Sequence, residues 1–211
     1  MSADLSKKSN LYLGHIEADI SMISLIKNAF LELNTNSKQE VRSKRYSEVN
    51  QSSSLGIIYN SKTPGSLFPI FQSEYSALWK SFSKCTHHIK QHFGPGYFAR
   101  CLITQLAPNK KILPHIDPGW GFTIPHRIHW IISTNDQTQF TIDDESFSFK
   151  QWELWEINNK LIHSVVNNGT SNRIHVIFDY VRAYDQKLHY CKHIDPNSDE
   201  YKTLDYWFER I

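Results

Sequence analysis

Two kinds of hydrophobic pattern divide the chain. In the first hundred residues, apolar side chains recur every three or four positions, which is the spacing of one helix face. This pattern predicts a helix that begins after Asp19, a residue type that caps helix N-termini, and a stronger helix over residues 73–93 that ends at a Gly-Pro-Gly turn. The stretches 52–54 and 63–65, rich in Ser, Pro and Gly, are expected to be loops.

From residue 97 onward the pattern changes to short segments rich in β-branched and aromatic residues, separated by turn residues. The predicted strands cover residues 97–106, 112–116, 127–134, 139–142, 146–149, 152–157, 163–167 and 173–182. Eight short strands with close turns are typical of a double-sheet jelly roll and not of a parallel α/β sheet. We therefore predict a mainly β fold with helices packed on one sheet.

The 211 residues are enough for one domain with its own core. We predict a single domain over residues 1–211 in three parts. A mixed, partly helical part over 1–96 packs on the barrel, the jelly-roll catalytic core covers 97–182, and a loop and helix form 183–211.

Composition narrows the classes of partner. Lys and Arg total 23 against 21 acids, so the formal charge of +2 leaves no electrostatic footprint for nucleic acid. The N-terminus lacks the apolar core of a signal peptide, and no apolar run approaches the ~20 residues that span a bilayer. The three cysteines are an odd number without a CxxC spacing, which fits a reducing compartment. We therefore expect a cytoplasmic protein that binds neither nucleic acid nor membranes.

Histidine and aspartate at alternating positions indicate a metal site. In His115-Ile116-Asp117, the outer two residues would point to the same face of a strand and present one nitrogen and one oxygen ligand. His163, several strands later, supplies a second nitrogen. Two histidines and one carboxylate leave the remaining coordination positions open, which suits non-haem Fe(II). His115, Asp117 and His163 are therefore the candidate metal ligands and catalytic residues.

Arg173 opens the strand after His163 and links the metal group to a carboxylate ligand. In a hairpin this arginine would lie beside His163 and deeper in the barrel, where a guanidinium can bind a carboxylate through two hydrogen bonds. A dicarboxylic co-substrate would chelate the metal at one end and meet Arg173 at the other. The alternative is an ordinary salt bridge with Asp179 on the same strand face. The position of Arg173 relative to the metal motif favours the co-substrate.

Four segments between residues 101 and 180 carry a family resemblance: LITQLAPNKKILPHID, HRIHWIIST, WELWEINNKLIHSVVNNG and NRIHVIFDY. Together they resemble the aspartyl/asparaginyl β-hydroxylase family of 2-oxoglutarate oxygenases. The last two segments are the most specific, because they combine the distal histidine, an Asn-rich turn and an Arg-Ile-His strand. The resemblance implies a cupin-like double-stranded β-helix, in agreement with the strand pattern. Some members of the family lack the carboxylate ligand, whereas this chain has Asp117.

The resemblance also implies roles, carried over position by position. The three metal ligands match, and Arg173 and Thr104 match the residues that bind the distal carboxylate of 2-oxoglutarate. Arg127 and His129 match an Arg-x-His pair that lines the pocket. One or both would contact the metal-bound end of the co-substrate or an acidic group on the substrate, and the family does not decide which.

Two further residues are candidates for substrate contact. His175 shares a strand face with Arg173, where a core histidine bonded to a neighbour is the stronger interpretation. Trp120 follows the metal motif in a Gly-rich loop, and it either covers the substrate as part of a lid or packs on the N-terminal helices.

These features predict a dioxygenase that uses Fe(II), 2-oxoglutarate and O₂ to hydroxylate an Asp- or Asn-like side chain, free or in a peptide. The alternatives are a non-catalytic cupin-like binding module and a cupin enzyme that uses another metal without 2-oxoglutarate. The complete ligand set argues against the first alternative. The second would leave Arg173 and Thr104 without a shared purpose.

Overall fold

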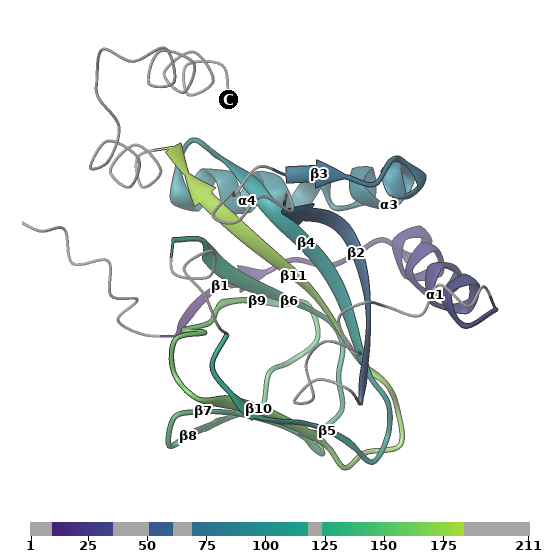
Figure 1. The fold of residues 1–211 in the computed structure, drawn as a ribbon, viewed down its shortest axis with the longest axis vertical. Helices are drawn as coiled ribbons and strands as arrows, with labels where there is room; N and C mark the ends of the chain where they lie inside the picture. The colour runs from purple at the N-terminus through teal and green to yellow at the C-terminus, as the bar shows by residue number, and fades with distance from the viewer. Residues whose placement is uncertain (1–9, 36–50, 61–68, 118–123, 184–211) are drawn as a thin grey trace, which may run out of the picture.

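Two antiparallel sheets face each other in the computed structural model, which describes residues 10–35, 51–60, 69–117 and 124–183 (Figure 1). The larger sheet has the strand order β1 (Leu11–His15), β9 (Glu153–Glu156), β6 (His126–Ser133), β11 (Arg173–Arg182), β4 (Gly96–Leu106), β2 (Ser52–Asn60) and β3 (Pro69–Phe71). The smaller sheet has the order β5 (Lys110–His115), β10 (His163–Asn167), β7 (Thr138–Ile142) and β8 (Glu145–Phe147). The predicted β-sandwich is confirmed, and each predicted strand after residue 97 has a counterpart.

Residues 52–54, expected to be a loop, instead begin strand β2. This prediction was wrong because it relied on local preference. Ser54 is the register partner of Thr104, and β2 pairs with β4 along most of its length. Tertiary pairing overrides the weak strand preference of serine, since that preference reflects packing more than the backbone. The stretch 63–65 lies outside the described residues.

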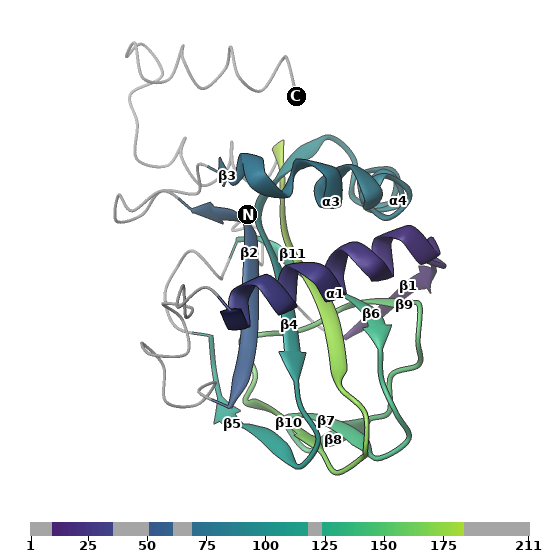
Figure 2. The same cartoon turned by 90° about the vertical axis from the view of Figure 1, so that its right-hand side faces the viewer.

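Helix α1 (Ile20–Thr35) begins where the sequence predicts. The carbonyl of Asp19 accepts hydrogen bonds from the backbone N–H groups of Met22 and Ile23, which starts the first turn. The buried face carries Met22, Ile26, Ala29 and Phe30, whereas Ile20 is 83% exposed. Figure 2 shows α1 crossing the outer face of the larger sheet in front of β2 and β4.

The single helix predicted over residues 73–93 is interrupted. The structure has a 3₁₀ turn, η2 (Ser73–Tyr75), followed by α3 (Ser76–Ser81) and α4 (Ser83–Phe93). At the break, Phe82 has φ −85° and ψ 4°, and its ring meets Trp130 and Phe178 edge-to-face at 6.0 and 5.9 Å. The break lets Phe82 reach the core beneath the helices, so aromatic packing ends α3 before its helical pattern does.

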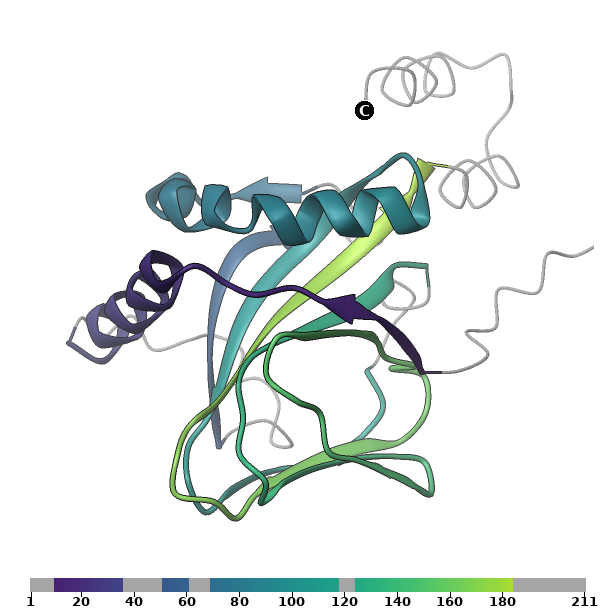
Figure 3. The same ribbon diagram turned by 180° about the vertical axis from the view of Figure 1, so that it is seen from behind.

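Alternation along the central strands separates two cores. On β11, Ile174, Val176, Phe178 and Tyr180 pack with the helices on the outer face of the larger sheet. A second cluster, which includes Leu106, fills the space between the two sheets. Figure 3 shows the smaller sheet opposite the inner face of β2, β4 and β11. Arg173 and the residues that alternate with those outer-facing positions therefore face the smaller sheet.

Strands β10 and β11 do not form the hairpin expected around Arg173. They belong to different sheets, because β10 pairs with β5 and β7 while β11 pairs with β4 and β6. Asn167 shapes the crossing: its Nδ2 donates to the carbonyls of Leu106 and Ser171, at 3.0 and 2.9 Å, and its Oδ1 accepts from the N–H of Gly169. Arg173 thus belongs to the sheet opposite His163.

The described chain ends at residue 183, so the loop and helix expected for 183–211 lie almost wholly outside it. The extent of the single domain remains a prediction. Within the described residues, the helices are too short or too polar to cross a lipid bilayer.

Candidate metal and co-substrate site

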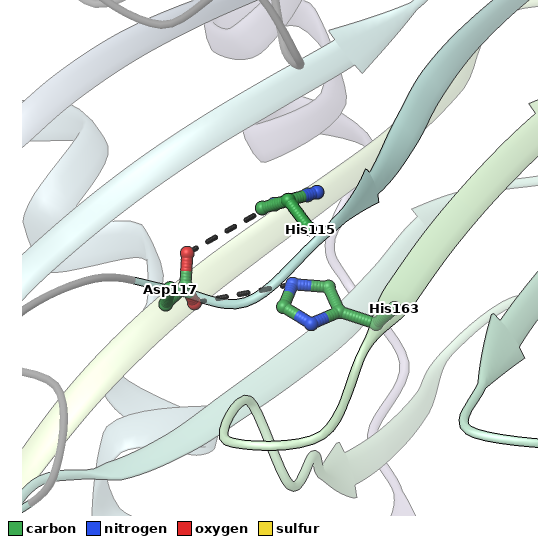
Figure 4. A group of neighbouring side chains, drawn as sticks. All are labelled: His115, Asp117 and His163. Atoms are coloured by element: carbon green, nitrogen blue, oxygen red, sulfur yellow. Dashed lines mark ion pairs between the residues drawn. The ribbon is translucent and has the colours of Figure 1, made fainter.

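His115, Asp117 and His163 bring their ligand atoms within 4.8 Å of one another. His115 ends β5 and His163 begins β10, and the two are register partners in the smaller sheet. The Nε2 atom of each histidine lies 4.0 Å from an oxygen of Asp117 (Figure 4). One nitrogen–nitrogen–oxygen set therefore forms at the edge of the barrel.

Backbone carbonyls select which nitrogen of each histidine faces this set. Nδ1–H of His115 donates to the carbonyl of Leu113 at 2.7 Å, and Nδ1–H of His163 donates to the carbonyl of Leu161 at 3.0 Å. This leaves the lone pair on Nε2, as in metal-binding histidines oriented by an outer hydrogen bond. Burial lowers the pKa of His163, which favours the neutral ring that binds a metal.

Asp117 is held by two neighbours. Its backbone N–H donates to the carbonyl of Asn159 at 3.3 Å, and Nδ2 of Asn159 donates to Oδ2 of Asp117 at 3.2 Å. Nη1 of Arg127 donates to the same oxygen. Asn159, which lies in the Asn-rich turn ahead of His163, thus fixes a metal-ligand candidate.

Arg127 belongs to a buried row of alternating charges. Its Nε and Nη2 donate to the two oxygens of Asp179 at 2.9 and 2.8 Å, and Asp179 also accepts from Nη1 of Arg100 at 3.0 Å. Although burial by itself lowers it, Asp117 and Asp179 together raise the pKa of Arg127 above its usual value. Arg127 therefore stays charged.

Arg173 is 1% exposed and meets no carboxylate among the described residues. Its Nη1 donates to Oγ1 of Thr104 at 3.3 Å and its Nη2 to Nδ1 of His175 at 2.7 Å, while Nε has no partner in the described chain. The salt bridge with Asp179 does not form, because six residues of one extended strand separate the two positions by roughly 20 Å. Asp179 pairs with Arg127 and Arg100 instead. Burial lowers the pKa of Arg173 to about 9, still above neutral pH, so the side chain is a buried cation.

Two histidines surround this cation. Because a guanidinium only donates, Nδ1 of His175 accepts from Arg173, and Nδ1 of His129, 3.3 Å from it, is then also a donor. Burial, reinforced by the charge of Arg173, lowers the pKa of both rings well below the usual value. Both are neutral at pH 7, and His175 is the neighbour-bonded core histidine that we expected.

These histidines predict a loss of stability in mild acid. Both remain neutral in the folded state, whereas in the unfolded chain each takes up a proton below its usual pKa of about 6.5. The free energy of unfolding should fall as pH drops below about 6.5, by up to about 1.4 kcal/mol per pH unit and histidine until the lowered pKa is reached. Urea denaturation at about pH 7.5 and about pH 5.5 measures this loss. A double variant, His129→Gln with His175→Gln, should lose less, and an equal loss would contradict the prediction.

One pocket joins the metal-ligand candidates to Arg173. It encloses about 450 Å³ of space, including its open mouth. The smaller sheet and the segment just after β5 contribute His115, Asp117 and His163, and the larger sheet contributes Thr104, Arg127, His129 and Arg173. Ser52 of β2 also lines the pocket, a residue that sequence reasoning missed by placing it in a loop. His175 lies behind Arg173, and Trp120 lies outside the described residues.

Comparisons with known proteins agree with this architecture. A family model described as aspartyl/asparaginyl beta-hydroxylase matches residues 24–183. No curated protein matches the chain. Among solved structures, the fold is similar to a prolyl hydroxylase from Trichoplax adhaerens in complex with a hypoxia inducible factor oxygen degradation domain peptide fragment, with TM-score 0.55, 11% identity, and coverage of 87% of this chain and 88% of that one.

Two other solved structures share the fold. A Pseudomonas putida prolyl-4-hydroxylase has TM-score 0.51 and 11% identity, with 85% of this chain and 95% of that chain covered. A viral collagen prolyl hydroxylase from Paramecium Bursaria Chlorella virus-1, solved as a 2-oxoglutarate complex, has TM-score 0.51 and 10% identity, with 83% and 97% covered. At such low identities, these structures support the fold alone.

Proposed function

The chain belongs to the aspartyl/asparaginyl beta-hydroxylase family, and from this premise we propose that its pocket binds Fe(II) and 2-oxoglutarate and hydroxylates an amino-acid side chain. The substrate would be a free amino acid or a residue of a peptide, used together with O₂. Each part of the proposal assigns a task to described residues.

The observation that carries the proposal is the buried Arg173 without a carboxylate partner in the described chain. A buried charge that lacks a counter-ion costs several kcal/mol. A carboxylate of 2-oxoglutarate would supply the counter-ion, with Thr104 as a hydroxyl donor beside it. The same pocket holds the metal-ligand candidates, so one dicarboxylate could contact Arg173 at one end and a bound metal at the other. A cupin enzyme without 2-oxoglutarate gives no reason for this cation.

The residues present also fit Fe(II). His115, Asp117 and His163 offer two ring nitrogens and one carboxylate, the donor set of non-haem Fe(II) oxygenases. When bound, the metal and the co-substrate supply the oxidising chemistry. The protein's own contribution is to orient both ligands and to exclude water. The lining from Ile112, Phe140, Val165 and Ile177 provides the apolar walls for that.

His129 and Arg127 have different proposed roles in the pocket. His129 is buried, lines the pocket and would contact the co-substrate. Arg127 donates to two carboxylates of the chain itself. The similar structure from Trichoplax adhaerens contains a peptide fragment, which supports testing peptides alongside free amino acids as substrates.

Ligand-dependent stabilisation tests the proposal. We expect 2-oxoglutarate to raise the melting temperature in the presence of Mn(II), because ligand bound to the native state adds about 2.7 kcal/mol at a concentration of 100 Kd. Glutarate, which lacks the keto group that chelates a metal, is the matched control and should stabilise less. With Fe(II) and O₂, succinate should form, and a candidate peptide or amino acid should gain one oxygen atom by mass spectrometry. Stabilisation without succinate formation would favour the non-catalytic binding module.

A further inference from the structure

Arg127 lies where the sequence places a cation for the co-substrate or the substrate, yet it faces carboxylates of its own chain. Nη1 donates to Oδ2 of Asp117, and Nε and Nη2 form a two-point contact with Asp179. The side chain is 4% exposed. The charge of Arg127 is therefore balanced inside the protein before any substrate binds.

We propose that Arg127, together with Asn159, is a positioning residue that restricts Asp117 to a single metal bond through Oδ1, an inference that rests on the proposed function. Both donors meet at Oδ2, Arg127 through Nη1 and Asn159 through Nδ2 at 3.2 Å. The other oxygen, Oδ1, lies 4.0 Å from Nε2 of His115, and Oδ2 lies equally far from Nε2 of His163, so the two oxygens differ in their hydrogen-bond donors and not in their distance from the histidines. The two oxygens of one carboxylate thus have different surroundings.

The difference matters because a carboxylate binds metals through one oxygen or through both. A second bond from Asp117 would occupy a coordination position that the co-substrate and O₂ require. Two hydrogen bonds to Oδ2, one of them from a cation, would engage its lone pairs and leave Oδ1 as the oxygen that binds the metal. The arrangement keeps Asp117 as one ligand of three and leaves the open face to the reactants.

Neighbouring strands hold Arg127 in place. Asp179 on β11 is the register partner of Arg127 on β6 and of Arg100 on β4, so the three charges form one rung across the larger sheet. Asp179 is 2% exposed, and its contact with two nitrogens of Arg127 fixes the plane of the guanidinium. To reach a substrate, Arg127 would have to abandon two buried carboxylates, which is costly. Arg127 is therefore not the residue that selects an acidic substrate.

Cobalt substitution tests the proposal with a readout other than activity. The absorption spectrum of bound Co(II) reports coordination number and geometry, and 2-oxoglutarate affinity is measured on the Mn(II)-loaded protein. Asn159→Leu removes one donor and leaves the charged rung intact, so it is the variant expected to fold most readily. Arg127→Lys keeps the charge but loses the planar guanidinium with its several donors, and Asp179→Asn weakens the contact that holds this guanidinium in place. Arg100→Gln is the matched control, because Arg100 contacts the rung but not Asp117.

We expect Asn159→Leu and Arg127→Lys to bind Co(II) at saturating concentration with a changed spectrum. Their metal affinity should fall by about 10–100-fold, the usual effect of losing a partner of a metal ligand, and the metal-loaded variants should bind 2-oxoglutarate more weakly than the wild type. Asp179→Asn should give a smaller change in the same direction, and Arg100→Gln should leave the spectrum as in the wild type. Should Arg127→Lys not fold, Asn159→Leu decides.

Two results would overturn the proposal. Unchanged spectra and unchanged 2-oxoglutarate affinity in both Asn159→Leu and Arg127→Lys would exclude a positioning role. If Arg127→Lys then raised only the KM for the substrate, Arg127 would be a substrate-binding residue. A wild-type protein that binds neither metal nor 2-oxoglutarate is a different failure, because it removes the proposed function itself and this proposal with it.

Discussion

Replacing Arg173 with methionine should abolish 2-oxoglutarate binding while leaving the ligand-free protein about as stable as the wild type. The co-substrate loses a charge-assisted fork in which each hydrogen bond contributes about 1.5–3 kcal/mol. The ligand-free protein, in contrast, loses a buried cation that has no carboxylate partner in the described chain. Replacing buried charges with apolar groups of similar volume is often neutral or stabilising. Arg173→Lys keeps the charge but loses the fork, so an intermediate affinity is expected.

Calorimetric titration of 2-oxoglutarate into the Mn(II)-loaded variants measures the loss of binding. Urea denaturation of the ligand-free proteins measures the free energy of unfolding. Arg127→Met provides the contrast, because it breaks a paired buried charge and should cost about 3–5 kcal/mol of stability. Metal affinity should stay near that of the wild type in Arg173→Met. If Arg173→Met binds 2-oxoglutarate as tightly as the wild type, the co-substrate assignment fails. If instead it unfolds as readily as Arg127→Met, Arg173 is a structural residue.

Loss of either histidine of the proposed metal site should have the second large effect. His115→Ala and His163→Ala each remove one of three ligands, and metal affinity should fall by more than the ~10–100-fold that loss of an outer partner costs. Turnover should become undetectable. Stability of the metal-free protein should change little, because the site is carried by a barrel with its own core.

His126→Ala is the matched control for these variants. His126 also belongs to the barrel, but its Nδ1 contacts Glu156 at 2.6 Å and its ring packs on Phe93. It should therefore leave metal affinity unchanged. Asp117→Ala completes the series, since some members of the family lack a carboxylate at that position. Wild-type turnover in Asp117→Ala would show that the two histidines alone suffice.

Residue alternation made much of the barrel predictable. A strand with polar Arg173 and His175 on one face and apolar Ile174 and Val176 on the other fits only between two different environments, and the structure supplies both. The group of His115, Asp117 and His163 could be predicted from the same alternation, although β5 ends at His115 and Asp117 is held in place by Asn159 and Arg127. Local pattern and global fold agree there.

The remaining features depend on contacts between distant segments. Ser52 and Ser54 have no local reason to be a strand, and only the edge of β4 makes them one. The break at Phe82 follows from aromatic rings on β6 and β11 that lie far away in sequence. The pairing of Asp179 with Arg127 depends on a register across strands that no spacing in the sequence reveals.

The separation of β10 and β11 into opposite sheets has a mechanical consequence. The metal-ligand candidates belong to the smaller sheet and the segment after β5, whereas Arg173 belongs to the larger sheet. A dicarboxylate that contacts both would therefore connect the two sheets. Its binding should slow amide hydrogen exchange in β5 and β10 as well as in β11, although β11 shares no backbone ladder with β5 or β10. A co-substrate bound in this way would also fix the distance between the two sheets.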